Sequence, residues 1–228
     1  MNFNDDFSKR AVVHAQQVPW VASPMPGVER RMLDRIGDEV ARATTIVRYA
    51  PGSAFSAHTH TGGEEYLVLE GVFQDEHGDF PAGTYVRNPP SSSHTPRAEG
   101  GATILVKLWQ FDPEDRTQLA VDTNTAALSP VEDRDGVSEI PLFHDDREKV
   151  RIEVWDAGQS VNLESHDGLE VFVLEGGFSE GGEDFGVQSW LRLPAGHPLK
   201  AVAGPKGARL WVKSDHLAQH ITAPGAVR

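Results

Sequence analysis

The chain has 228 residues, 39% of them hydrophobic, and a formal net charge of -13. This length and composition allow a sizeable core in one large or two compact domains, and they exclude wholesale disorder. The acidic residues are spread over both halves and the basic residues form no cluster, so neither a nucleic-acid partner nor a membrane surface is expected.

The sequence contains no cysteine. Disulfide scaffolds, cysteine-type zinc fingers, iron–sulfur clusters and thiol nucleophiles are therefore excluded, and any bound metal must be held by nitrogen and oxygen. The N-terminal residues show no secretory-signal pattern, and no apolar run reaches the about 18 residues of a membrane helix. We therefore expect a cytoplasmic protein.

Short runs of β-branched and aromatic residues alternate with glycine, proline and aspartate along the whole chain, which predicts an all-β sandwich or barrel. Val28–Ile36 stays undecided, because its apolar residues have helical spacing while Gly37 interrupts the run and a strand-like segment follows. The predicted strands, in chain order, are Ala43–Tyr49, Glu65–Leu69, Gly83–Val86, Ala102–Phe111, Lys149–Trp155, Val171–Leu174, Ser189–Leu193 and Ala208–Lys213.

An internal repeat gives the domain organisation. Val68–Phe73 (VLEGVF) returns 105 residues later as Val173–Phe178 (VLEGGF). Two copies are too few for a solenoid and indicate a tandem duplication of one β-domain. We expect an N-terminal domain over residues 1–115, with an arm at 1–25, and a C-terminal domain over 116–228, with a linker at 112–136. Further matches between the copies are Arg87 with Arg192, Pro89 with Pro194, and Val106-Lys107 with Val212-Lys213.

Three histidines and one glutamate have the pattern of a metal site. His58 and His60 alternate along a strand and so share one face, and a Thr-Gly-Gly turn then leads to Glu64. His94 can supply a third imidazole from a neighbouring strand. Three imidazoles and one carboxylate suit a single divalent transition metal, with iron or zinc first and manganese or nickel next, and leave positions open for water, O₂ or substrate.

The same residues resemble the two sequence motifs of the cupin superfamily. The first motif is matched in full by Gly52, His58, His60, Glu64 and Gly71. The second is matched by Gly83, Pro89 and His94, but Ser91 stands in place of its glycine and Ala98 in place of its asparagine, which questions the turn after Pro90. The longer string around both motifs resembles the ChrR-like cupins in particular. The resemblance implies two tandem cupin jelly-roll barrels, a bicupin, with His58, His60, Glu64 and His94 as metal ligands.

The second copy retains only part of the motif. Aligning Gly158 with Gly52 places Glu164, His166 and Glu170 at the positions of His58, His60 and Glu64, while His197 lies two residues before the His94 position. A vestigial apolar core is the preferred interpretation. A second site made of Glu164, His166, Glu170 and His197 is the alternative, and its extra carboxylate would favour a harder cation such as Mn²⁺.

Other side chains give weaker signals. Tyr66 shares strand parity with Glu64 and Arg87 with Tyr85, so both are candidates for a substrate pocket, although a structural role is the preferred interpretation of each. The five tryptophans are expected to pack in the core. The remaining histidines lack ligand spacing and are expected to be solvated; they are His14, His77, His144, His216 and His220.

Two functions fit this pattern. The first is an enzyme whose mononuclear non-haem metal acts on a small organic molecule, such as an O₂-dependent dioxygenase. The alternative is a non-catalytic metal or stress sensor, because ChrR-like cupins form the sensing half of certain anti-sigma factors. Those proteins bind the sigma factor through a domain whose zinc is held by histidine and cysteine. This chain has no cysteine, so a sigma-factor partner is not expected. A small-molecule ligand is expected, and a homodimer is compatible with the sequence.

Overall fold

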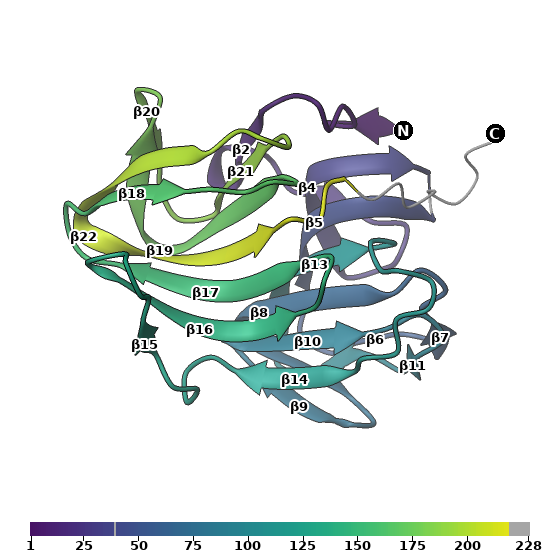
Figure 1. Ribbon diagram of the computed structural model, residues 1–228. Helices are drawn as coiled ribbons and strands as arrows, with labels where there is room; N and C mark the ends of the chain where they lie inside the picture. The colour runs from purple at the N-terminus through teal and green to yellow at the C-terminus, as the bar shows by residue number, and fades with distance from the viewer. Residues whose placement is uncertain (39, 219–228) are drawn as a thin grey trace. The chain divides into compact units, whose positions relative to one another are not determined.

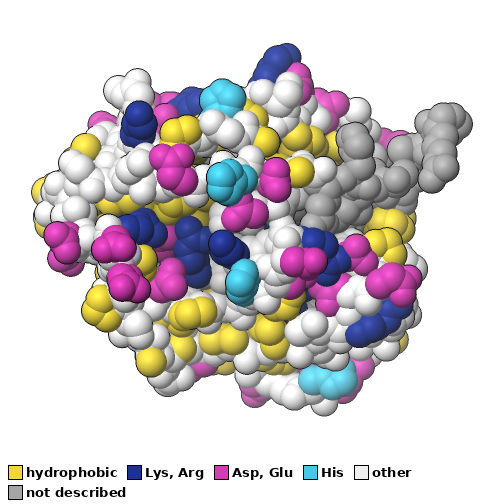
Figure 2. Space-filling view, in the orientation of Figure 1, with side chains coloured by type: hydrophobic (Ala, Val, Ile, Leu, Met, Phe, Trp, Pro, Cys, Tyr) yellow, Lys and Arg dark blue, Asp and Glu magenta, His cyan; other side chains and the backbone are white. Residues whose placement is uncertain are grey.

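The computed structural model describes residues 1–38 and 40–218 and confirms the all-β expectation (Figure 1). The chain divides into two compact units. Unit 1 comprises Met1–Asp5 and Pro19–Thr125, and unit 2 comprises Asp6–Val18 and residues 126–218. Across the described residues, no helix has the length and apolar character needed to cross a membrane. Acidic and basic side chains are interspersed on the face shown in Figure 2.

Unit 1 is built on an antiparallel sheet with the strand order β1-β4-β5-β13-β8-β10-β14, while β7 pairs separately with β11. Strand β8 lies between β13 and β10, and its Tyr66 stands opposite Val106 and Val86. Its strands are β1 (Asn2–Phe3), β3 (Val21–Ala22), β4 (Val28–Gly37), β5 (Ala41–Tyr49), β6 (Ser53–Ala54), β7 (His58–Thr59), β8 (Glu64–Asp75), β9 (Gly78–Pro81), β10 (Thr84–Asn88), β11 (Ser93–His94), β12 (Arg97–Ala98), β13 (Ala102–Leu108) and β14 (Leu119–Asp122).

Unit 2 repeats this arrangement with the strand order β15-β16-β17-β22-β19-β21-β2. Its edge strand β2 comes from the N-terminal segment, next to one short 3₁₀ helix, η1 (Ala15–Gln17). Its strands are β2 (Ala11–His14), β15 (Ser129–Pro130), β16 (Val137–His144), β17 (Lys149–Trp155), β18 (Ser160–Leu163), β19 (Leu169–Glu180), β20 (Glu183–Phe185), β21 (Ser189–Leu193) and β22 (Leu199–Ser214).

Alternate residues of the strands form the core of each unit, as the pleat of a strand requires. In unit 1 the core contains Tyr66 and Val68 of β8, with Val86 of β10 and Ile104 and Val106 of β13. In unit 2 the corresponding positions carry Val171, Val173, Leu191, Leu210 and Val212. The even-numbered residues at the start of β8, including Glu64, therefore face the interior of unit 1.

The segment that stayed undecided from its sequence is strand β4. Its pairing with β5 shifts between Met32 and Asp34, so Leu33 is an extra residue in the ladder. Such a bulge breaks the two-residue alternation of a strand. The buried apolar residues Val28 and Leu33 are therefore five positions apart, a separation that regular two-residue alternation would place on opposite faces.

The register of the two central strands shows how the two units correspond. Glu65 lies opposite Arg87 and Lys107, and Glu170 lies opposite Arg192 and Lys213. Glu170 is therefore the counterpart of Glu65, at the offset of 105 residues seen in the sequence repeat. Two equivalent glycines, Gly71 and Gly176, support this offset. A Cβ on Gly71 would lie 2.2 Å from the carbonyl oxygen of Gly101, just before β13, and a Cβ on Gly176 would lie 2.1 Å from the carbonyl oxygen of Gly207, in β22.

The segment expected as a linker has paired structure. Strand β14 pairs with β10 in unit 1, strand β15 pairs with β16 in unit 2, and the units divide between Thr125 and Ala126. The N-terminal segment is shared as well, since β1 and β3 pair with β4 whereas β2 pairs with β21.

Candidate metal centre

Two short strands bring the three motif histidines of unit 1 together. Strand β7 pairs with β11, so that His58 lies directly opposite His94, and the backbone of His60 continues the pairing through bonds to Ser91 and Ser92. The three imidazole ring centroids are 4.6 to 5.0 Å apart. Each ring offers one nitrogen to a group whose atoms all lie within 4.8 Å of one another. Among the described residues, His58, His60 and His94 form the one group of three or more histidine or carboxylate side chains with the spacing of metal ligands.

Glu64 adds a buried carboxylate to this group. Gly63 precedes it with a φ of +75°, and a Cβ there would lie 2.4 Å from the ring of Phe111, so the turn requires glycine. Glu64 Oε2 lies 3.4 Å from Nε2 of His60 and 3.7 Å from Nε2 of His94. Two atoms that bind one ion at about 2.0–2.2 Å are separated by about 3.0–3.5 Å. The distance to His60 falls in this range and the distance to His94 is slightly longer, and both exceed the length of an ordinary hydrogen bond, so the spacing suits ligands of a shared ion better than a direct hydrogen bond.

The hydrogen bonds of the rings leave Nε2 available for a metal. Nδ1 of His58 donates to the carbonyl oxygen of Ser56 (3.1 Å), and Nδ1 of His94 donates to Oδ2 of Asp75 (3.0 Å). A neutral imidazole that donates through Nδ1 carries its lone pair on Nε2. Nε2 of His60 is buried and has no hydrogen-bond partner among the described residues. The donor set fits a divalent transition metal, because an ion would satisfy this buried nitrogen.

Burial also favours the protonation states that a metal needs. It lowers the pKa of His60 to about 4, with the neighbouring His58 adding to the effect. It lowers the pKa of His94 as well, against the opposing influence of Glu64 and Asp75. Burial raises the pKa of Glu64, which stabilises its neutral form until a cation compensates the carboxylate charge. Neutral imidazoles are the form that binds metal ions.

Two residues that support the ligands were not recognised from the sequence. Asp75 accepts the bond from His94, and its other oxygen accepts a 2.7 Å bond from the backbone of His77. Asn88 lies opposite Glu64 on β10 and donates to its Oε2 (3.2 Å). The alternation of β8 places Asp75 on the face opposite to Glu64 if the strand is regular. The ladder between β8 and β13 shifts between Val68 and Glu70, however, and this bulge turns Asp75 to the same interior face as Glu64.

The second motif keeps its turn despite the two departures. Ser91 takes the left-handed conformation that glycine would have, with φ of +75°, and its N–H donates to the carbonyl oxygen of His60. Ala98 is fully buried in the core of unit 1. The turn after Pro90 therefore has the geometry that brings His94 beside His58, at the cost of backbone strain in Ser91.

The structure separates the two candidate pocket residues. Tyr66 shares the interior face with Glu64, is 1% exposed, and its hydroxyl has no hydrogen-bond partner among the described residues. Arg87 faces the other way, where its guanidinium donates to Oδ2 of Asp115 (3.0 and 3.2 Å) and lies 4.2 Å from the ring of Phe111. Tyr66 therefore lies on the metal-centre side of the sheet, and Arg87 is held in a buried ion pair.

The four side chains proposed for a second site in unit 2 do not form a group with metal-ligand geometry among the described residues. Glu164, His166 and His197 are exposed, and Glu164 accepts a bond from Asn162. Glu170 is buried on the opposite face of β19, where it accepts bonds from Trp190 and His216. The expected equivalence of Glu170 with Glu64 is wrong by one residue, and one residue in a strand exchanges its two faces.

Leucines occupy the positions of three of the four metal ligands in unit 2. At the offset of 105 residues, Leu163, Leu169 and Leu199 correspond to His58, Glu64 and His94. Leu163 lies opposite Leu199 as His58 lies opposite His94. All three leucines are at most 4% exposed and belong to one apolar cluster. This agrees with the vestigial interpretation, because an apolar cluster offers no metal ligands.

The other histidines differ in their surroundings. His77 and His144 are exposed, as expected, whereas His14 is half-buried and bonded to Glu183 and Ser189. The expectation of a solvated His216 is wrong, because its ring is buried with Nε2 3.0 Å from Glu170. His220 lies outside the described residues.

Comparisons with known proteins agree with this geometry. Residues 8–112 match the family model of the ChrR cupin-like domain. A solved structure of a proposed dioxygenase from Nostoc punctiforme PCC 73102 superimposes with a TM-score of 0.75 at 15% identity, over 97% of this chain and 88% of that one. The bacterial pirin YhhW from Escherichia coli, solved in complex with nickel(II), gives 0.65 at 12% identity, over 90% and 98%.

No curated protein matches the chain. A proposed glyoxylate-induced protein from Pseudomonas aeruginosa gives a TM-score of 0.70 at 16% identity, over 90% of this chain and 87% of that one. At such identities the likeness establishes the fold alone, while the family match covers the residues of the metal centre. Residues 8–112 are therefore similar to the ChrR cupin-like domain, and the chain as a whole shares its fold with these solved structures.

Proposed function

We propose that this protein is a metal-dependent oxidoreductase of the dioxygenase type that acts on a small organic molecule. The observation that carries the proposal is the convergence of three imidazoles, with ligand atoms within 4.8 Å, beside the buried carboxylate of Glu64. The fold shared with the proposed dioxygenase from Nostoc punctiforme supports it. The nickel(II) complex of the Escherichia coli pirin supports a metal in this fold.

His58, His60, Glu64 and His94 would hold one divalent transition metal, for which iron is the proposed ion. When bound, such an ion supplies Lewis-acid and oxygen-activating chemistry at its open positions. The rest of the chain keeps the ligands in place through hydrogen bonds. Asp75 orients His94, the carbonyl of Ser56 orients His58, and Asn88 orients Glu64. Such supporting contacts fix ring orientation and raise metal affinity.

The site has one open side and one closed side. His58 is exposed, whereas His60, Glu64 and His94 are each at most 8% exposed. A small molecule can therefore reach the centre past His58. On the closed side, the Tyr66 hydroxyl has a pKa raised by burial, which keeps it a neutral hydrogen-bond donor. We assign to Tyr66 the role of donor to an oxygen atom of the substrate.

Oxygen consumption tests this function. Metal-free protein is reconstituted separately with Fe(II), Mn(II), Ni(II) and Zn(II), and oxygen uptake is recorded with a panel of β-diketones and dihydroxyaromatic ketones. We expect metal-dependent uptake in the wild type and in His144→Ala, whose exposed imidazole lies on β16 of unit 2, but none in His94→Ala. Tight zinc without uptake across the panel would overturn the dioxygenase assignment and favour a sensing role.

A further inference from the structure

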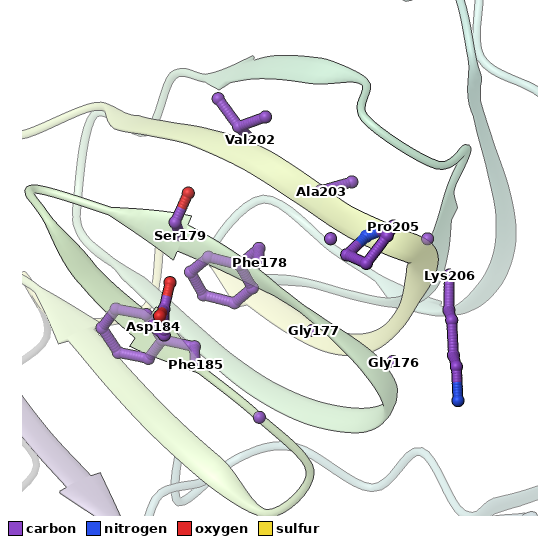
Figure 3. A pocket seen from close by; sticks show the side chains of 13 residues that line it. Gly176, Gly177, Phe178, Ser179, Asp184, Phe185, Val202, Ala203, Pro205 and Lys206 are labelled. Carbon is purple, nitrogen blue, oxygen red and sulfur yellow. The ribbon is translucent and has the colours of Figure 1, made fainter.

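Unit 2 contains a cavity of about 530 Å³ that lies between the β19–β20 hairpin and residues 202–207 of β22 (Figure 3). Its lining comes from residues 176–179, 184–186 and 202–207, and includes five glycines. Cavities of about 300–1,000 Å³ are the size of small-molecule sites. We call this cavity the hairpin pocket. It is separate from the metal centre, which lies in unit 1.

Unit 1 has the same framework at the corresponding place. Phe178 pairs with Phe185 and Ser179 with Asp184, as Phe73 pairs with Phe80 and Gln74 with Asp79. Ser179 also lies opposite Val202, as Gln74 lies opposite Arg97. Every residue of the hairpin pocket up to Gly204 therefore has a counterpart 105 residues earlier, and the two places can be compared side chain by side chain.

In unit 1 this place is filled by polar side chains. Gln74 donates to Oδ1 of Asp79 (2.7 Å) and accepts from the backbone N–H of Glu99 (3.1 Å). Arg97 donates to the carbonyl oxygen of Asp75 (3.2 Å), and its guanidinium lies 4.0 Å from Asp79 and 3.5 Å from Glu99. A guanidinium thus occupies the place in unit 1, next to a carboxylate of the β8–β9 hairpin.

In unit 2 the large side chains are replaced by small ones, which opens the pocket. Ser179 stands for Gln74, Val202 for Arg97 and Gly204 for Glu99. The wall loses two further side chains, since Gly177 and Gly186 correspond to Val72 and Pro81. One feature of the unit 1 network persists, because Asp184 keeps the carboxylate of Asp79.

The retained carboxylate indicates the charge of a ligand. Asp184 forms no ion pair within the described part of the chain, although its counterpart in unit 1 lies beside Arg97. The cation in the lining, Lys206, lies at the other end of the pocket in Figure 3 and extends away from Asp184. The net charge of -13 also attracts cations to the protein.

The remaining walls are apolar. Phe178 and Phe185 stack beneath the pocket with ring centroids 4.7 Å apart and planes within 8°. Val202, which is 43% exposed, and Pro205 line the opposite side, whereas Ala203 between them packs in the core. A ligand with a short aliphatic body would cover the exposed surfaces of Val202 and Pro205.

We propose that the hairpin pocket binds a small organic cation, an alkylguanidinium or primary alkylamine, whose charged group takes the place that the Arg97 guanidinium has in unit 1. Asp184 accepts hydrogen bonds from the charged group, and Val202 and Pro205 contact the alkyl chain. Charge-assisted bonds to a carboxylate give such a site its preference for cations.

Titration followed by ¹H–¹⁵N NMR of the full chain tests this proposal. The probes are n-butylguanidinium and n-butylamine, with butyrate and n-butanol as the anionic and neutral ligands of the same chain length. We expect saturable shifts of the amides of Gly177, Ser179 and Gly186 with the two cations only. Equal binding of butyrate or butanol, or no saturable binding of either cation, would overturn the proposal.

Matched variants locate the binding. Val202→Arg restores the unit 1 side chain and should abolish the shifts, whereas Val202→Thr keeps the branched shape and should change the affinity by no more than about twofold. Asp184→Asn should weaken binding about tenfold, and Asp79→Asn in unit 1 should leave it unchanged. Wild-type-like spectra outside the pocket show that each variant is folded. Undiminished binding in Val202→Arg would refute the site.

Discussion

Removing the Asp75 carboxylate should weaken metal binding without removing a ligand. Asp75 is 5% exposed, and its Oδ2 accepts the Nδ1–H of His94 at 3.0 Å. Asp75→Ala leaves that N–H unpaired in a buried place and frees the ring to rotate. Loss of such a supporting contact costs about 10–100-fold in metal affinity, which corresponds to about 1.4–2.8 kcal/mol. Asp75→Asn retains an oxygen acceptor without the charge and should lie between the wild type and Asp75→Ala.

The assay is competition of the metal-stripped protein with a chelating dye, for the wild type and each variant. Glu76→Gln is the matched control, because it removes a neighbouring negative charge that accepts the backbone N–H of Thr95 rather than the imidazole of His94. Imidazole ¹⁵N shifts of the metal-free protein supply a second readout, and they should place the His94 proton on Nδ1 in the wild type. Wild-type affinity in Asp75→Ala, or an Nε2 proton on His94, would refute the reasoning.

Three further predictions concern stability. Ser91→Gly should raise the free energy of unfolding by up to about 1 kcal/mol, because glycine takes the left-handed conformation without strain; a loss of stability in urea unfolding would contradict this. Glu153 is fully buried, and burial alone would raise its pKa, but the bonds from Arg134 and the charge of Arg151 outweigh burial and lower it. The ionised Glu153 therefore stabilises the fold above its unfolded pKa of about 4.5, and this stabilisation is lost as the pH falls through the lower folded pKa. Glu153→Gln should lower the free energy of unfolding by about 3–5 kcal/mol at pH 7 and make that free energy less dependent on acid pH. Urea unfolding of both proteins at several pH values checks this. Leu169→Ala should cost about 2–5 kcal/mol and leave the metal content unchanged, and a loss of metal would place a metal site in unit 2.

Much of the fold could be predicted from local patterns. The bounds of β17 and β21 agree with the prediction, because each is a run of alternating or apolar residues between turn signals. Strand β4 could not be assigned, since the bulge at Leu33 breaks the two-residue alternation that indicates a strand. The pairing of β2 with β21 was also beyond local patterns, because it depends on contacts between residues more than 170 positions apart.

The candidate site was predictable where its residues are close in sequence. His58, His60 and Glu64 lie within one motif, and the resemblance to the cupins connected them with His94. Asp75 could not be found in this way, because the bulge in β8 changes which face it occupies. In unit 2 the strand is regular there, but the alignment of the two copies was displaced by one residue. This displacement assigned the buried Glu170 to the wrong face of β19.

The metal content of the purified protein tests the central claim most directly. Elemental analysis of the wild type should find one equivalent of a divalent transition metal per chain, and anomalous diffraction at the absorption edge of that element should place it within coordination distance of His58, His60 and His94. His60→Ala should contain none. Full occupancy in His60→Ala, or a wild type that retains no metal when it is supplied, would contradict the account.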